Sequence, residues 1–171
     1  MRISEEGKQL IRDFEGLRLS AYRDAVGVLT IGYGHTKGVR LGQTITRAEA
    51  EKLLSADLDP IESQLPADLG EDGVLQSQFD ALCSFSFNLG IGAYIKSTLR
   101  KYVKAGRDDE ADREFAKWVH AGGRVLPGLV RRRKAEAELY APAGGVTAFF
   151  VGILEMLAMG LALAVCREMV L

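Results

Sequence analysis

The chain has 171 residues, of which 47% are hydrophobic, which is enough apolar material for one packed domain of ordinary size. The formal net charge is −1 and no basic segment is interleaved with aromatic residues, so nucleic acid is excluded as an expected partner. The two cysteines form neither a disulfide framework nor a metal-binding spacing, and the N-terminus MRISEEGKQL contains no apolar segment of a signal peptide.

The first predicted element is a helix with an acidic residue at its end. Ser4 is a suitable N-cap, and Ile11 and Phe14 fall on one face of a helical pattern. Glu15 then lies in the last turn, and Gly16 is expected to end the helix in a left-handed conformation.

Two short strands are predicted next, at residues 21–23 and 28–31, around a turn at residues 24–27. Asp24 opens this turn and Thr30 lies in the second strand. A helix end that carries one acid therefore faces a small antiparallel sheet that carries a second acid and a hydroxyl group.

Two carboxylates on separate rigid elements suit cleavage of a glycosidic bond. One must donate a proton to the leaving oxygen, while the other stays ionised and activates water or attacks the sugar. From their spacing alone, however, Glu15 and Asp24 are more typical of ordinary surface charges on a helix end and a turn.

A longer helical stretch is expected after the sheet. Residues 46–49 form a capping-box signature for a helix that begins there. Pro60 is expected early in a second short helix that Pro66 limits, and the boundary between two lobes is placed at residues 60–73.

Residues 74–89 are too apolar for a surface helix, and we interpret them as the buried central helix of the larger lobe. Cys83 in this segment is expected to be a buried thiol. Further helices are predicted at residues 97–105 and 109–119, the second one capped by Asp108.

Gly122-Gly123 is expected to interrupt the chain before a last helix at residues 129–139, with Pro127 in a first helical position. This helix contains the basic run 131–134. By itself the run is typical of a solvated helix face.

His35 and Trp118 can each be interpreted as a functional or as a structural residue. His35 could take part in catalysis, but a structural contact with a carboxylate is the favoured interpretation. Trp118 could stack on a sugar, but a core position beside Phe115 is favoured.

The string from residue 14 to residue 36, FEGLRLSAYRDAVGVLTIGYGHT, resembles the phage-type lysozymes (endolysins), which are muramidases. The resemblance covers residues 4–140 and continues, in the same order, in three further segments. These are QFDALCSFSFNLG (78–90), KSTLRKYVKAG (96–106) and EFAKWVHAGGRVLPGLVRRRKAEAELY (114–140).

The resemblance implies an α+β, mostly helical, lysozyme-like two-lobed fold with a small antiparallel sheet and a larger helical lobe. It also implies a peptidoglycan hydrolase that cleaves the β-1,4 bond between N-acetylmuramic acid and N-acetylglucosamine without a cofactor. Glu15 would be the general acid, Asp24 the base or electrostatic stabiliser, and Thr30 the residue that positions water. The expected glycan-binding residues are Thr36, Phe87, Ser97 and Gly128, and one or two arginines of the basic run would face the cleft.

The family usually ends near Tyr140, so the muramidase domain is assigned to residues 1–145 and an apolar tail to residues 146–171. Residues 146–165 contain one charge, Glu155, and are long enough for a membrane span. They could instead pack on the enzyme domain or be a non-native extension. We expect a monomer in the host bacterial cytoplasm that reaches the wall after the membrane is permeabilised.

Two other functions stay open at this level. The domain could hold glycan without cutting it, although an intact set of three catalytic positions argues against this. Alternatively, the tail could disrupt membranes and carry the domain as cargo.

Overall fold

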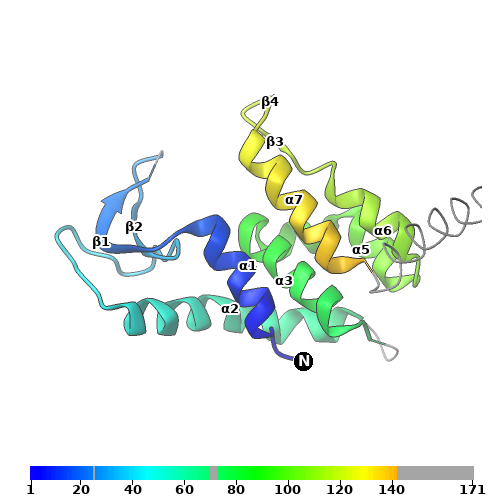
Figure 1. Ribbon diagram of the computed structural model, residues 1–171, viewed down its shortest axis with the longest axis horizontal. Coiled ribbons are helices and arrows are strands. Elements are labelled where there is room, and N and C mark those ends of the chain that lie inside the picture. Colours follow the sequence, from blue (N-terminus) through cyan, green and yellow to red (C-terminus); the bar gives the residue numbers. More distant parts are fainter. Residues whose placement is uncertain (25, 70–72, 142–171) are drawn as a thin grey trace, which may run out of the picture. The chain divides into compact units, whose positions relative to one another are not determined.

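The computed structural model describes residues 1–24, 26–69 and 73–141, and nearly all of these belong to one unit, Met1–Tyr140. Helices predominate, and the strands form small antiparallel sheets (Figure 1). The predicted α+β, mostly helical class is confirmed. The elements, in chain order, are α1 (Glu5–Glu15), β1 (Arg18–Arg23), β2 (Leu29–Gly32), α2 (Arg47–Leu69), α3 (Gln76–Leu89), α4 (Ile91–Lys96), α5 (Thr98–Lys104), α6 (Asp108–Phe115), β3 (His120–Ala121), β4 (Arg124–Val125) and α7 (Pro127–Tyr140).

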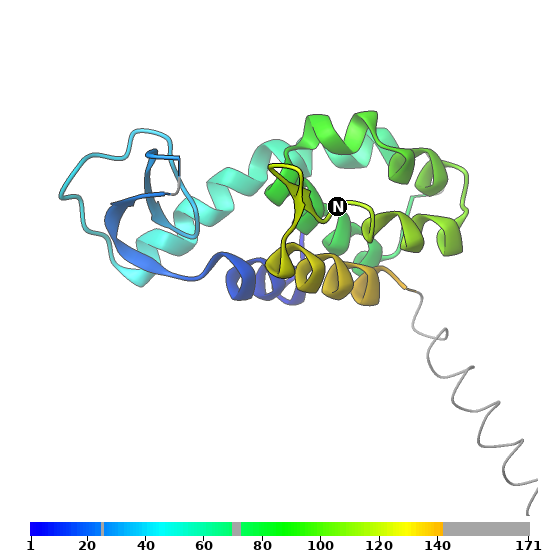
Figure 2. The same ribbon diagram turned by 90° about the horizontal axis from the view of Figure 1, so that it is seen from above.

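Strands β1 and β2 pair directly after α1, as expected. Tyr22 is opposite Thr30 and Arg23 is opposite Leu29, with an irregularity in the register nearer the start of β1. An isolated bridge from Ser20 to Thr44 adds the following loop to the other side of β1. The sheet lies at one end of α2, and α3, α4 and α5 pack toward the other end (Figures 1 and 2).

Helix α2 corrects the prediction of a break at its prolines. It continues through Pro60 and Pro66 to Leu69. The sequence predicts a second short helix beginning near Pro60 and a lobe boundary at residues 60–73. A proline inside a helix costs about 3 kcal/mol, so the two prolines together cost about 6 kcal/mol. The apolar face outweighs this cost, because each fully buried aliphatic side chain contributes about 1.5–3 kcal/mol. That face is formed by Leu54, Leu58, Ile61, Leu65 and Leu69.

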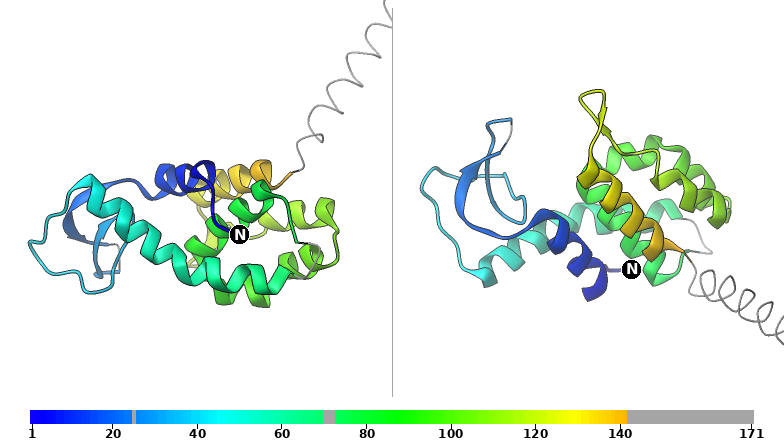
Figure 3. Two further views of the ribbon diagram at one scale, coloured as in Figure 1. Left: turned by 90° about the horizontal axis from the view of Figure 1, so that it is seen from below. Right: turned by 45° about the horizontal axis from the view of Figure 1, so that its top comes forward.

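Helix α3 is the buried central helix that the sequence predicts. It packs against α1, α2, α4 and α7 (Figure 3). Phe79, Leu82 and Phe85 are fully buried, as is the free thiol of Cys83. The expectation of a buried core thiol is confirmed, and burial raises the pKa of this thiol.

The second half of the unit differs in detail from the prediction. Helix α4 was not predicted. Helix α6 begins at Asp108 and ends at Phe115, so Asp108 is not its cap, and its carboxylate accepts a hydrogen bond from Tyr140 (3.0 Å). Gly122 and Gly123 do not merely interrupt the chain. Both have positive φ values (56° and 73°) and form the turn of the β3–β4 hairpin.

Within residues 1–24, 26–69 and 73–141, no helix combines the length and the apolar character needed to cross a bilayer. The predicted membrane segment, residues 146–165, lies outside the residues that the structure describes.

Candidate active site

Glu15 is the last residue of α1, as predicted. Gly16 follows with φ = 70°, and its N–H donates to the carbonyl of Arg12. A side chain at position 16 would be strained at this φ, so glycine allows the chain to leave the helix directly after the acid.

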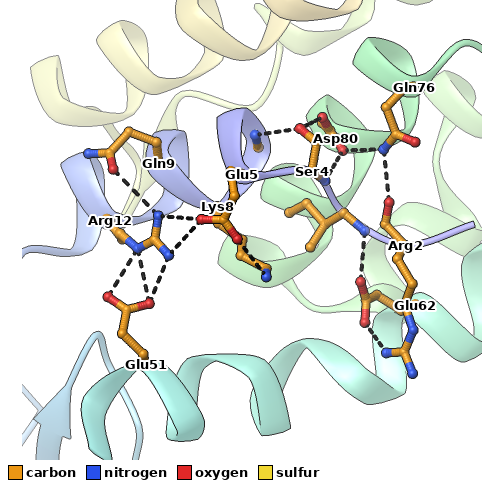
Figure 4. Close-up of polar contacts among 12 residues, drawn as sticks. Arg2, Ser4, Glu5, Lys8, Gln9, Arg12, Glu51, Glu62, Gln76 and Asp80 are labelled. Carbon is orange, nitrogen blue, oxygen red and sulfur yellow. Dashed lines mark hydrogen bonds and ion pairs between the residues drawn. The ribbon is translucent and has the colours of Figure 1, made fainter. Parts of the chain in front are cut away.

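Polar contacts at both ends of α1 hold the helix that carries Glu15 (Figure 4). The guanidinium of Arg12 binds the Glu51 carboxylate of α2, with Nη2 2.8 Å from Oε2. At the other end, the backbone N–H of Ser4 donates to Asp80 of α3 at 2.9 Å. Each end of α1 is therefore fixed to a different helix.

Asp24 and Thr30 lie close together because both bind the peptide groups of one residue. The N–H of Val28 donates to Asp24 Oδ1 at 2.8 Å, and the N–H of Val26 donates to the same oxygen at 3.0 Å. Thr30 Oγ1 donates to the carbonyl of Val28 at 3.2 Å. The β1–β2 turn thus orients the acid, and the second strand holds a nearly buried hydroxyl beside it.

The two oxygens of Glu15 have different surroundings. Oε1 accepts a hydrogen bond from Arg132 Nη1 of α7 at 2.6 Å. Oε2 lies over Gly34, where an added Cβ would be 3.5 Å from it. The Glu15 side chain retains 22% of its exposure, so solvent and substrate can reach it although it is paired.

Arg132 belongs to a buried ionic cluster between α3 and α7. Its Nε lies 3.1 Å from Glu136 Oε1, and the same oxygen accepts bonds from Ser84 Oγ (2.8 Å) and Arg133 Nη2 (3.0 Å). Arg133 Nη2 also donates to Asn88 of α3. Burial raises the pKa of Glu136, while the two guanidinium groups act in the opposite direction.

The reading of the basic run as a solvated helix face is therefore wrong for two of its four residues. Arg132 and Arg133 are buried, and Arg131 and Lys134 are exposed. Arg132 reaches Glu15, and the expectation that one or two arginines face a glycan cleft stays a prediction. A signal was present in the sequence, because Glu136 follows the inward pair at helical spacings of three and four residues.

His35 has the structural role that the sequence favours. Its Nδ1 lies 2.9 Å from both carboxylate oxygens of Asp57 on α2, and its Nε2 lies 2.8 Å from the carbonyl of Lys37. Both ring nitrogens are therefore used in holding the loop after β2 against α2.

The predicted glycan-binding residues divide into two pairs. Thr36 and Phe87 line one hollow, together with Gly34, Lys37 and Asp57. Ser97 does not line it: its hydroxyl is buried, donates to the carbonyl of Tyr94 and accepts from the N–H of Arg100 as the N-cap of α5. Gly128 lies in the first turn of α7 and does not line it either.

Trp118 is partly buried and packs against the core, and it lies just beyond the end of α6. Its ring meets the ring of Phe85 edge to face, with centroids 5.4 Å apart. Phe115 contacts Phe85 in the same way.

A helical unit with a small sheet, an acid at the end of its first helix and a second acid on a hairpin turn defines a lysozyme-type glycoside hydrolase. Residues 12–136 match the phage lysozyme family. The chain belongs to this family, and its substrate class is bacterial peptidoglycan.

Individual relatives of the chain are endolysins and a muramidase domain. The chain is 42% identical to the endolysin of Acyrthosiphon pisum secondary endosymbiont phage 1 over 147 residues, which cover 84% of this chain and all of that protein. It is 45% identical to the endolysin of Bacillus phage B103, covering 82% of this chain but only 54% of that longer protein. Among solved structures, the muramidase domain of SpmX from Asticaccaulis excentricus superimposes with a TM-score of 0.77 at 39% identity, covering 82% of this chain and 98% of that domain.

Proposed function

We propose that the enzyme hydrolyses the β-1,4 bond between N-acetylmuramic acid and N-acetylglucosamine, with Glu15 as general acid, Asp24 as general base and Thr30 as the residue that orients water. The observation that supports the role of Glu15 is the difference between its two oxygens: Arg132 binds Oε1, while Oε2 lies over Gly34 at the edge of the hollow.

The proposed reaction is attack of water at C1, assisted by one acid and one base. The Glu15 carboxyl gives its proton to the glycosidic oxygen as the bond to C1 breaks. Water attacks C1 from the other face of the sugar, and Asp24 takes the proton that this water loses. Configuration at C1 is then inverted. Exchange with solvent returns a proton to Glu15 and removes the proton that Asp24 accepted.

Arg132 supports this assignment electrostatically. Glu15 gains negative charge as it gives up its proton, and the guanidinium at 2.6 Å stabilises that charge. Since the charge develops during the reaction, the interaction strengthens toward the transition state.

Glu15→Gln tests the role of the acid. The substitution keeps size and hydrogen bonding but removes the proton donor, so the rate of peptidoglycan hydrolysis should fall roughly 10²- to 10⁴-fold. Asp13→Asn is the matched control, because Asp13 is exposed on the same helix two residues earlier. Near-normal turnover by folded Glu15→Gln protein would remove Glu15 from the role.

The glycan strand is proposed to contact Thr36 and Phe87, which line the hollow with Lys37. For Ser97 and Gly128 we propose an indirect role in glycan binding. Ser97 caps the start of α5, and Gly128 lies in the first turn of α7. The enzyme is further proposed to be a monomer of the host cytoplasm, released to the wall for phage lysis.

A further inference from the structure

Glu136 is a fully buried acid that does not line the hollow. Its side chain has 0% exposure and lies at the contact between α3 and α7. Removing a carboxylate from water is costly unless its hydrogen-bonding capacity is filled. Its Oε1 accepts hydrogen bonds from three donors, Ser84 Oγ, Arg132 Nε and Arg133 Nη2, and its Oε2 lies in an ion pair with Arg133.

We infer that Glu136 is a positioning residue that orients Arg132 and, through Arg132, the proposed catalytic acid Glu15. Two edges of the Arg132 guanidinium are occupied by the cluster: Nε by Glu136, and Nη2 by the carbonyl oxygen (3.3 Å) and hydroxyl (3.4 Å) of Ser84. Nη1 is thereby directed to Glu15 Oε1. The planar fork of an arginine transmits such an orientation, which an ammonium group on a flexible stem would not.

The face of the guanidinium is fixed as well. The Arg132 Cζ lies 5.6 Å from the centroid of the Phe14 ring, and Phe14 precedes Glu15 on α1. Arg133 completes the charge balance, with its Nε 2.9 Å from Glu136 Oε2 and its Cζ 5.0 Å from the Phe85 ring centroid.

The inference rests on the proposed role of Glu15, and a double-mutant cycle tests it. Kinetics of hydrolysis of soluble peptidoglycan fragments are measured for Glu136→Gln, Arg132→Met and the double variant, each corrected for its folded fraction. Glu136→Gln should lower kcat on the order of 10-fold with little change in KM, because a displaced acid affects the chemical step more than binding.

In the Arg132→Met background, Glu136→Gln should change kcat by less than about twofold, because the intermediary is already gone. If the kcat of the double variant falls by the product of the losses in the two single variants, the inference is overturned. A rise in KM with unchanged kcat would overturn it as well. A purely structural role for Glu136 would lower the melting temperature and leave kcat per folded molecule unchanged.

Two further variants keep the result interpretable. Glu114→Gln is the matched control, since Glu114 is a buried acid on α6 that pairs with Lys117, and its kcat should stay at the wild-type value. If Glu136→Gln does not fold, Ser84→Ala replaces it in the cycle and should give a smaller loss that also vanishes in the Arg132→Met background. Inactive Glu15→Gln with fully active Glu136→Gln would overturn only this inference, whereas active Glu15→Gln would overturn the proposed function.

Discussion

Gly7 of α1 lies so close to Asp80 of α3 that a Cβ at position 7 would be 2.7 Å from the Asp80 Cβ. It would also be 2.7 Å from Ile3 Cγ1. The absence of a side chain at Gly7 therefore sets how closely the helix that carries Glu15 approaches the central helix.

Gly7→Ala should destabilise the fold by about 1–3 kcal/mol, because the two helices must separate to admit the methyl group. Gly92→Ala is the control: Gly92 is an exposed helical residue with open space around its Cβ position. This second substitution should be neutral or stabilise by up to about 1 kcal/mol. Chemical denaturation measures both, and equal stability of the two variants would contradict the steric argument.

Asp24→Asn should abolish most activity and keep the hairpin turn, because the amide oxygen can still accept from Val26 and Val28. The expected loss is roughly 10²- to 10⁴-fold, as for removal of a general base. NMR of the first product formed by the wild-type enzyme should show inverted configuration at the anomeric carbon. Retained configuration, or a glycosyl group trapped on Asp24 and detected by mass spectrometry, would make Asp24 a nucleophile instead.

The Asp68–Arg100 pair links α2 to α5 and predicts a pH-dependent stability. Hydrogen bonds from Arg100 lower the pKa of Asp68. The stabilisation is thus present above the ordinary Asp value of about 3.9 and is lost as pH falls through the lowered value.

Asp68→Asn should accordingly lower the free energy of unfolding by about 1 kcal/mol at pH 7, a figure reduced for the partial exposure of Arg100. The difference from wild type should be smaller at an acidic pH below the lowered pKa of Asp68 than at pH 7. Glu138→Gln, which breaks an exposed contact with Lys134, is the control and should have little effect at either pH. An equal deficit for Asp68→Asn at both pH values would rule out the ionic origin.

Membrane contact through residues 146–165 stays a prediction. Flotation with liposomes should carry the full chain to the lipid fraction and leave a chain that ends at Gly145 behind, because 20 residues at 1.5 Å each match a bilayer core of about 30 Å. Glu155 opposes insertion unless it is protonated or paired. If both chains stay in the aqueous fraction, the membrane hypothesis fails. Wall lysis by the same two chains also tests whether the tail carries the main function.

Several local features could be predicted from the sequence because neighbouring residues determine them. A run almost without charges identified α3, and Gly16 ended α1 directly after Glu15. The turn that begins at Asp24 put the second acid at the tip of the hairpin. In each of these cases the deciding interactions span only a few residues of the chain.

Other features depended on contacts between distant segments. Pro60 and Pro66 indicate a break when α2 is considered alone, but packing of one continuous apolar face on the core keeps the helix intact. Arg132 and Arg133 indicate a solvated surface, yet both are buried. Their charges are compensated by Glu136 within α7 and, for Arg132, by Glu15, which is 117 residues away. Only the folded chain brings that partner within hydrogen-bond distance, and without it the burial of a guanidinium would be strongly unfavourable.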